Sequence, residues 1–178
     1  HGANLVKNHV FKFDFLNDEF SKLPQSLQDI INDENKRKKL VIYINPPYAE
    51  GDNVRGIGRK DVHVSKIHSK YQTLMGKASS EMFAQFFTRI YKEIPNSVLA
   101  EFSTLKILQA PNFSDFREFF RAKLEKIFLV QADTFDNVKG KFPIGFFIWN
   151  TEIRERFINI EADIYDREAN FTGIKNLY

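Results

Sequence analysis

The stretch Lys38-Lys39-Leu40-Val41-Ile42-Tyr43-Ile44-Asn45-Pro46-Pro47-Tyr48 decides the fold. Its apolar run, residues 40–44, is rich in β-branched side chains and predicts a strand buried on both faces, as at the centre of a parallel sheet. The two prolines donate no backbone N–H, so they end the strand. We therefore expect Asn45 at the carboxyl end of a buried strand, where open α/β sheets bind their ligands.

The tetrapeptide 45–48 suits a planar ring that carries an exocyclic amine. The carboxamide oxygen of Asn45 and the carbonyl of Pro46, which is held extended by the next proline, are two acceptors that can converge on one NH2 group. Tyr48 adds a flat face for stacking. Acceptors on both N–H bonds favour a pyramidal nitrogen and aim its lone pair at an electrophile, so no strong base is needed before attack.

Asn45-Pro46-Pro47-Tyr48 after an apolar strand resembles the catalytic motif of S-adenosylmethionine-dependent amino-methyltransferases, chiefly the DNA adenine-N6 methyltransferases of restriction–modification systems. The resemblance implies that these four residues are catalytic and that S-adenosylmethionine is the cofactor. It also implies a flipped-out adenine as substrate and double-stranded DNA as partner, together with a restriction or specificity subunit or domain. Asn rather than Ser at position 45 favours adenine over cytosine-N4.

Composition narrows the class of protein. The 178 residues are 43% hydrophobic and include 19 Phe, enough for one domain with an aromatic core. The absence of Cys excludes disulfides, thiolate catalysis and Cys-based zinc sites, and it fits a cytoplasmic protein. No apolar run approaches the roughly 20 residues of a membrane span. The net charge of +3 permits a nucleic acid partner. No metal is expected, because His63 and His68 lack a carboxylate partner at a recognised spacing.

The segment before the decisive stretch predicts a strand and a helix. Alternation over residues 10–17 indicates a short strand that ends near Asp14, and Pro24 suits the start of a helix. With the strand at 40–44 they predict a right-handed βαβ unit with parallel strands. Asp14-Phe15 resembles the Asp-Phe pair that ends the preceding strand in many adenine methyltransferases. The resemblance assigns these two residues to the cofactor's adenine.

Residues 49–77 predict a long, basic loop punctuated by glycines. We expect Arg55, Arg59 and Lys60 to run along a phosphate backbone, the alternative being an ordinary solvated loop.

The rest of the chain predicts alternating helices and strands. A helix is expected from Ser79 or Ser80 to Ile94, then a strand at 98–103. A short helix or an extension of that strand is expected at 104–110, and a helix from Ser114 with inward positions as far as Ile127. Residues 127–132 and 144–149 predict an antiparallel hairpin. The predicted fold class is α/β, a partial, Rossmann-like methyltransferase sheet, mostly parallel with a C-terminal antiparallel hairpin.

In the methyltransferase family, a Phe before the last strand often contacts the flipped base opposite the catalytic Tyr. The resemblance assigns this role to Phe135 or Phe142, and we favour Phe135. Residues 1–150 are thus predicted to be a partial catalytic domain, and residues 151–178 an extension toward a DNA-recognition region.

One departure from the family pattern is large. No Gly-rich Phe-x-Gly-x-Gly turn precedes Asp14 or follows Trp149, and the acidic residue that grips the ribose is absent. The start at His1-Gly2-Ala3 indicates a tag remnant or an internal boundary. We therefore expect a fragment that binds cofactor poorly and is inactive alone. Protein glutamine-N5 and RNA guanine-N2 methyltransferases share the motif and stay open. So does a non-catalytic methyltransferase-like module that binds DNA or a partner subunit.

Overall fold

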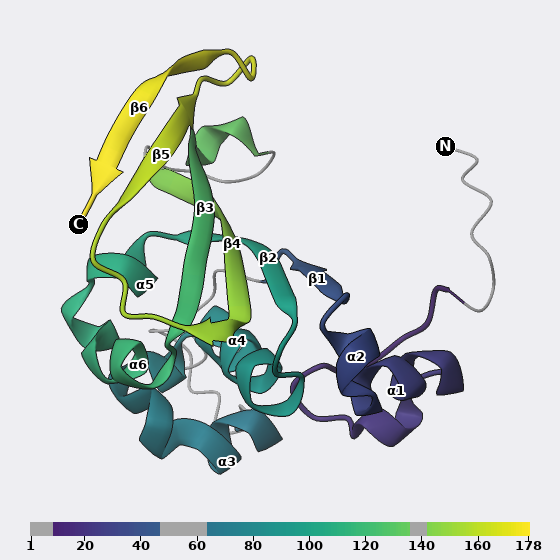
Figure 1. The fold of residues 1–178 in the computed structure, drawn as a ribbon. Coiled ribbons are helices and arrows are strands. Elements are labelled where there is room, and N and C mark those ends of the chain that lie inside the picture. Colours follow the sequence, from purple (N-terminus) through teal and green to yellow (C-terminus); the bar gives the residue numbers. More distant parts are fainter. Residues whose placement is uncertain (1–8, 47–63, 136–141) are drawn as a thin grey trace, which may run out of the picture.

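The structure, a computed structural model, describes residues 9–46, 64–135 and 142–178 (Figure 1). Its helices are α1 (Gln25–Asn32), α2 (Glu34–Arg37), α3 (Lys66–Met75), α4 (Met82–Glu93), α5 (Lys106–Gln109) and α6 (Ser114–Phe119). Its 3-10 turns are Phe20–Lys22, Gly76–Ser80, Pro111–Phe113 and Ala132–Thr134. Its strands are β1 (Val41–Ile44), β2 (Val98–Thr104), β3 (Ala122–Gln131), β4 (Pro143–Arg154), β5 (Ile160–Tyr165) and β6 (Phe171–Leu177).

The six strands form one mixed sheet in the order β1-β2-β4-β3-β5-β6. β1 pairs with β2, and β3 with β5, in parallel, whereas β4 is antiparallel to both of its neighbours and β6 is antiparallel to β5. The α/β class and the antiparallel pairing of residues 127–132 with 144–149 are confirmed. The sheet is mixed rather than mostly parallel in its pairing, because β4 lies between β2 and β3. β1, β2, β3 and β5 nevertheless all run in one direction.

β1 lies at an edge of the described sheet, so the prediction that residues 40–44 are buried on both faces is wrong. Val41 and Tyr43 are 61% and 62% exposed, whereas Ile42 and Ile44 pack against the core. β2 is its only neighbouring strand in the described part of the chain. One face of β1 is therefore open, although both faces are apolar in sequence.

The strand predicted before Asp14 does not form. The backbone N–H groups of Asn17 and Asp18 both donate to the carbonyl of Asp14, and the Asp18 carboxylate accepts from the N–H of Asp14. These bonds fold residues 14–18 into a turn. Asp and Asn side chains compete in this way with extended structure, and the predicted βαβ unit is wrong for the same reason. The helix after Pro24 is confirmed as α1.

Two helix boundaries differ from the prediction. Residues 66–75, expected to be loop, form α3, whose N-terminus is capped by Ser65 accepting from the N–H of His68 at 2.9 Å. The helix from Ser114 ends at Phe119 instead of continuing toward Ile127, because β3 starts at Ala122 and pairs with β4. Cross-strand pairing thus replaces the helical spacing of residues 120–127.

The helices pack against one face of the sheet. Phe83, Phe87 and Ile90 of α4 lie in a core cluster with Leu99 of β2 and Phe147 of β4, which confirms that the apolar stripe of α4 is core. Residues 151–178, predicted as an extension, contain the end of β4 and strands β5 and β6 of the same sheet. None of the helices in the described ranges is long and apolar enough to cross a membrane.

Candidate active site

Asn45 and Pro46 lie directly beyond the carboxyl end of β1. Ile44 is level with Glu101 in the parallel register, so Asn45 follows at the level of Phe102 on β2. The side chain of Asn45 is exposed and Pro46 is buried. This placement puts the carboxamide at the edge of the sheet where β1 and β2 both end. Pro47 and Tyr48 of the same motif, and Arg55, Arg59 and Lys60 of the basic segment, lie outside the described residues.

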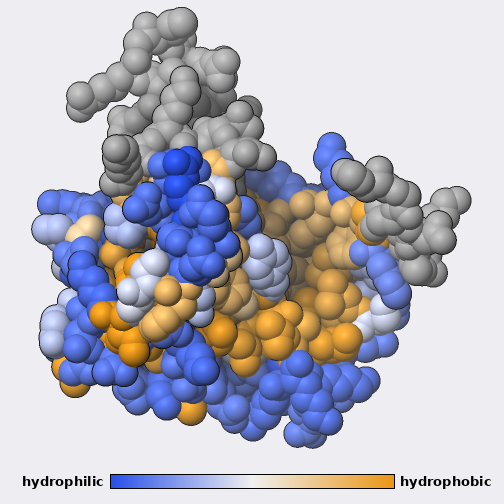
Figure 2. Space-filling view, turned by 90° about the horizontal axis from the view of Figure 1, so that it is seen from above, coloured by the Kyte–Doolittle hydropathy of each residue, from blue (hydrophilic) through white to orange (hydrophobic). Residues whose placement is uncertain are grey.

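Two cavities lie at this edge of the sheet. One cavity of about 580 Å³ is lined by Thr104, Lys106 and Phe142, among others, where β2 ends and β4 begins. A second of about 580 Å³ lies where β3 ends and also includes Phe142 in its lining. Seen from above, apolar side chains gather in a hollow between polar rims (Figure 2). Asn45 follows β1 at this same edge of the sheet, although neither Asn45 nor Pro46 belongs to the lining of the two cavities. Each cavity has room for a ligand of nucleobase size.

The two candidate base-contacting phenylalanines differ in their surroundings. The ring of Phe135 packs against Phe102 with centroids 5.2 Å apart, and the side chain is half-buried. Phe142 is 38% exposed and lines both cavities. Of the two, Phe142 is the ring that is open to a ligand in the hollow.

An ion pair between a partly exposed lysine and a buried glutamate lies beside the cavity at the end of β2. The Nζ of Lys106 lies 2.6 Å from a carboxylate oxygen of Glu81, which precedes the first residue of α4 and is only 2% exposed. The sequence did not predict either residue as part of the site. The available signal was position, since Lys106 follows the end of the predicted strand 98–103 by a few residues, and functional side chains gather after the carboxyl ends of parallel strands.

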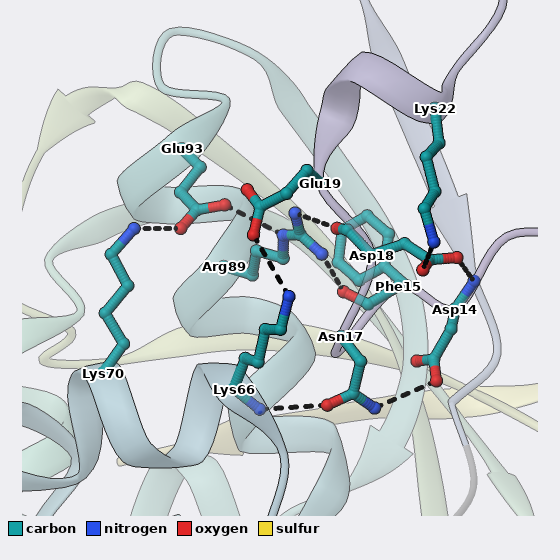
Figure 3. A network of polar contacts seen from close by, with 10 residues as sticks. All are labelled: Asp14, Phe15, Asn17, Asp18, Glu19, Lys22, Lys66, Lys70, Arg89 and Glu93. Atoms are coloured by element: carbon teal, nitrogen blue, oxygen red, sulfur yellow. Dashed lines mark hydrogen bonds and ion pairs between the residues drawn. The ribbon is translucent and has the colours of Figure 1, made fainter.

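Asp14 and Phe15, predicted to hold the cofactor's adenine, have other contacts (Figure 3). The Asp14 carboxylate accepts from the N–H of Leu16 at 3.1 Å and from the amide of Asn17 at 2.9 Å. The Phe15 ring stacks on Phe86 with centroids 5.3 Å apart. Asp14 is therefore held within its own turn rather than presented at a strand end, and Phe15 is a packing residue.

Arg89 fixes this turn to α4. It is 3% exposed, and its guanidinium donates to the carbonyls of Phe15 and Asp18 and to the carboxylate of Glu93. It also lies 4.2 Å from the ring centroid of Phe20. Glu93 accepts in addition from Lys70 and from the hydroxyl of Tyr71, and these hydrogen bonds lower the pKa of Glu93 despite the opposing effect of its burial. The network is structural, because its charged groups are already paired with one another.

Within residues 9–46, 64–135 and 142–178, no three His, Asp or Glu side chains come together as a metal-binding group. His68, on α3, has its Nδ1 3.0 Å from the carbonyl oxygen of Ser79. This contact gives that histidine a structural partner.

Comparison with known proteins places the fold. No protein-family model and no curated protein match the chain. It is similar to a chain of the DrdV–DNA complex solved by cryoEM, with a TM-score of 0.50 and 13% identity over 86% of this chain and 17% of that one. Weaker likenesses have a TM-score of 0.44. One is the ATP-dependent Type ISP restriction-modification enzyme LlaBIII bound to DNA, at 11% identity over 74% of this chain and 11% of that chain. The other is a modification subunit of a putative type I restriction enzyme from Vibrio vulnificus YJ016, at 14% identity over 72% and 28%.

The similarity to the DrdV chain concerns the fold, an α/β sheet with its helices. This chain spans 17% of the length of that chain.

Proposed function

We propose that this chain carries the substrate-binding edge of a DNA methyltransferase that modifies N6 of a flipped-out adenine. The observation that carries the proposal is the position of Asn45 and Pro46 directly after the carboxyl end of β1, at the edge of the sheet where a cavity of about 580 Å³ lies at the end of β2. The similarity of the fold to a chain solved in complex with DNA supports double-stranded DNA as the partner. The cytoplasmic location and a restriction or specificity partner stay predictions.

The residues act on the amine by position. The carboxamide oxygen of Asn45 and the carbonyl of Pro46 accept the two N6 hydrogens. These hydrogen bonds favour a pyramidal nitrogen, whose lone pair is no longer delocalised into the adenine ring and can attack an electrophile. The adenine must leave the duplex to reach this edge, because its amine is otherwise paired and stacked. Phe142 borders the space in which the base would lie. Tyr48 is proposed as the stacking ring from the motif alone.

The fit to S-adenosylmethionine is poor in the described residues. Asp14, the residue proposed to read the cofactor's adenine, is engaged with Leu16 and Asn17 in an exposed turn. The cofactor is therefore supported by the motif at 45–48 and not by a pocket among the residues that the structure describes.

The position of Asn45 and Pro46 after β1 also favours a second candidate function. A methyltransferase-like module without activity would keep the sheet and the tetrapeptide but need no ordered cofactor site. Such a module would bind DNA or a partner subunit through the same edge.

The deciding experiment uses the gene at its full length, expressed in a host without adenine methylation. N6-methyladenine in the host DNA is quantified by mass spectrometry for the unchanged protein, for Asn45→Ala and for Asn35→Ala, an exposed Asn of α2 that serves as the matched control. Methyladenine that is lost only in Asn45→Ala supports the first candidate. If the unchanged protein leaves no mark, adenine methylation is contradicted. DNA binding without the mark then favours the module, and an amine on protein or RNA becomes the substrate to test.

A further inference from the structure

A third cavity, of about 270 Å³, is lined by residues of α5, of α6 and of the segment that joins β4 to β5. We call it the arginine cavity, because Arg117 of α6 and Arg156 of the β4–β5 segment both line it. The rest of its lining is largely apolar and includes the buried side chains of Leu108, Phe120 and Trp149. In the described part of the chain it shares no lining residue with the two cavities near the ends of β2 and β3. The arginine cavity is therefore separate from the proposed base-binding edge.

The guanidinium of Arg117 is held through one of its three nitrogens. Nη1 donates to the carbonyl of Ala110 at 3.0 Å and to the carbonyl of Ile107 at 3.3 Å. Nε and Nη2 have no hydrogen-bond partner among the described residues, and neither atom is fully buried. These two N–H groups lie side by side on one edge of the guanidinium, and such an edge matches two oxygens of a carboxylate or a phosphate. The two backbone contacts thus orient an edge that is suited to an oxyanion.

Arg117 has no carboxylate partner within the described residues. It belongs to none of the ion pairs there, although Glu118 is next to it in the chain. Glu118 pairs instead with Arg121 and, at 3.4 Å, with Arg156, so one carboxylate serves two other arginines. Burial lowers the pKa of Arg117, and the charge of Arg156 acts in the same direction, against a smaller opposing effect of Glu118. An oxyanion beside the two arginines would offset both effects.

Asp115, the other acid in the lining, does not neutralise Arg117. Residues two apart on a helix do not face each other, so the two side chains point in different directions. The carboxylate of Asp115 lies against the turn at Gly76, where an added Cβ would be 2.2 Å from its Oδ2. The charge of Arg117 is therefore left to a ligand of the cavity.

We propose that the arginine cavity binds a small organic anion, whose carboxylate or phosphate group rests on the Nε–Nη2 edge of Arg117 beside Arg156 and whose apolar part lies against Phe120 and Trp149. Few, well-placed polar groups in an apolar lining are typical of small-molecule sites. A nucleic acid backbone would contact the arginines but leave the apolar lining unused. The proposal does not rest on the methyltransferase function.

The test uses Trp149, the single tryptophan of the chain, whose fluorescence reports directly on the cavity. The full chain is titrated with phenyl phosphate and with benzoate, which place two different oxyanions on the same ring. Inorganic phosphate and benzyl alcohol each lack one half of the proposed ligand. We expect a saturable change with phenyl phosphate or benzoate, at an affinity about tenfold or more above that of either incomplete probe. The tighter of the two ring-bearing probes identifies the preferred oxyanion, and the NMR signal of the indole N–H gives a second readout.

Three variants test the role of the arginines. Arg117→Lys keeps the charge but loses the planar edge, so binding should weaken about tenfold. Arg156→Leu, a change at a side chain that is 71% exposed, should weaken binding about threefold. Arg154→Leu is the matched control and should bind as the unchanged chain does, because Arg154 is exposed at the end of β4 and outside the lining. Circular dichroism and urea unfolding establish that each variant is folded.

Several results would overturn the proposal. One is the absence of saturable binding by both ring-bearing probes in fluorescence and in NMR. Another is binding that Arg117→Lys and Arg156→Leu leave unchanged. Equal affinity for inorganic phosphate or for benzyl alcohol would contradict a ligand with an anionic and an apolar part. An oligonucleotide that binds through Arg117 while phenyl phosphate and benzoate do not would assign the arginines to nucleic acid.

Discussion

The carboxyl group of Glu101 accepts a hydrogen bond from the indole Nε1 of Trp149 at 3.3 Å, on neighbouring strands in the core. The hydroxyl of Ser103 donates to the same oxygen at 3.4 Å, while the other oxygen has no partner among the described residues. Burial raises the pKa of Glu101 well above its ordinary value, although these two bonds act in the opposite direction. In the folded protein the carboxyl group of Glu101 therefore keeps its proton at pH values near the ordinary Glu pKa and above it.

The raised pKa of Glu101 makes stability depend on pH. The folded chain holds this proton more tightly than the unfolded chain, so its contribution is complete below the ordinary Glu pKa and is lost as pH rises toward the folded pKa. We expect the free energy of unfolding to fall across that window, with a slope of at most one proton per molecule from this group. Glu101→Gln should remove that part of the slope, whereas the exposed Glu161→Gln should keep it. Urea unfolding at a series of pH values measures both, and equal slopes for all three proteins would contradict the assignment.

Among the α4 side chains that face residues 13–20, Arg89 should be one whose substitution lowers the unfolding free energy most. Arg89→Met leaves the carbonyls of Phe15 and Asp18 without the donor that Arg89 supplies, and it removes the guanidinium from Glu93, which keeps Lys70 and Tyr71 as donors. We therefore expect a loss of about 3–5 kcal/mol in unfolding free energy. Lys92→Met, an exposed change on the same helix, should cost less than about 1 kcal/mol. Urea unfolding gives the two values. Limited proteolysis should show earlier cleavage near residues 14–18 in Arg89→Met alone, and an intact turn in that variant would speak against the anchoring role.

Helices and strands whose apolar residues follow a clear local pattern could be predicted from the sequence. The stripe of α4, with Phe83, Phe87 and Ile90, is set by helical spacing and appears as predicted. The strands at 98–104 and 143–154 also appear, because their apolar runs leave few alternatives to a buried strand.

Elements that depend on distant partners could not be predicted. Residues 10–14 alternate like a strand, but an alternating segment becomes a strand only where a neighbour takes its backbone hydrogen bonds, and the Asp14 turn forms here instead. The start of β3 at Ala122 is likewise decided by its pairing with β4 and not by local spacing. The position of Asn45 after a strand was predictable from the prolines. The cavity at the end of β2 was not, since Phe142 lies far along the chain from Thr104 and Lys106.

Gly76 should not tolerate a side chain. Its φ is +56°, and a Cβ built there would lie 2.2 Å from a carboxylate oxygen of Asp115, a residue of α6. Gly76→Ala therefore combines backbone strain with a steric clash, and we expect it to cost about 2–4 kcal/mol. Gly173→Ala is the control, because Gly173 also has positive φ but nothing lies within 4 Å of the added carbon. Thermal and urea unfolding should show the smaller loss at Gly173. A Gly76→Ala loss no larger than that of Gly173→Ala would mean that Asp115 moves aside at little cost.

If the proposed base-binding edge is correct, substitution of Phe142 should lower methylation activity, whereas substitution of Phe135 should lower the unfolding free energy. Phe142 is exposed at both cavities, so Phe142→Ala should lower methylation by the full-length protein on the order of tenfold to a hundredfold, the loss expected from one stacking contact. Its unfolding free energy should change by less than about 1 kcal/mol. Phe135→Ala removes a ring that packs on Phe102, so it should cost roughly 1–3 kcal/mol of stability. Product assays together with urea unfolding distinguish the two. An activity loss confined to a fully folded Phe135→Ala would return the base-contacting role to Phe135.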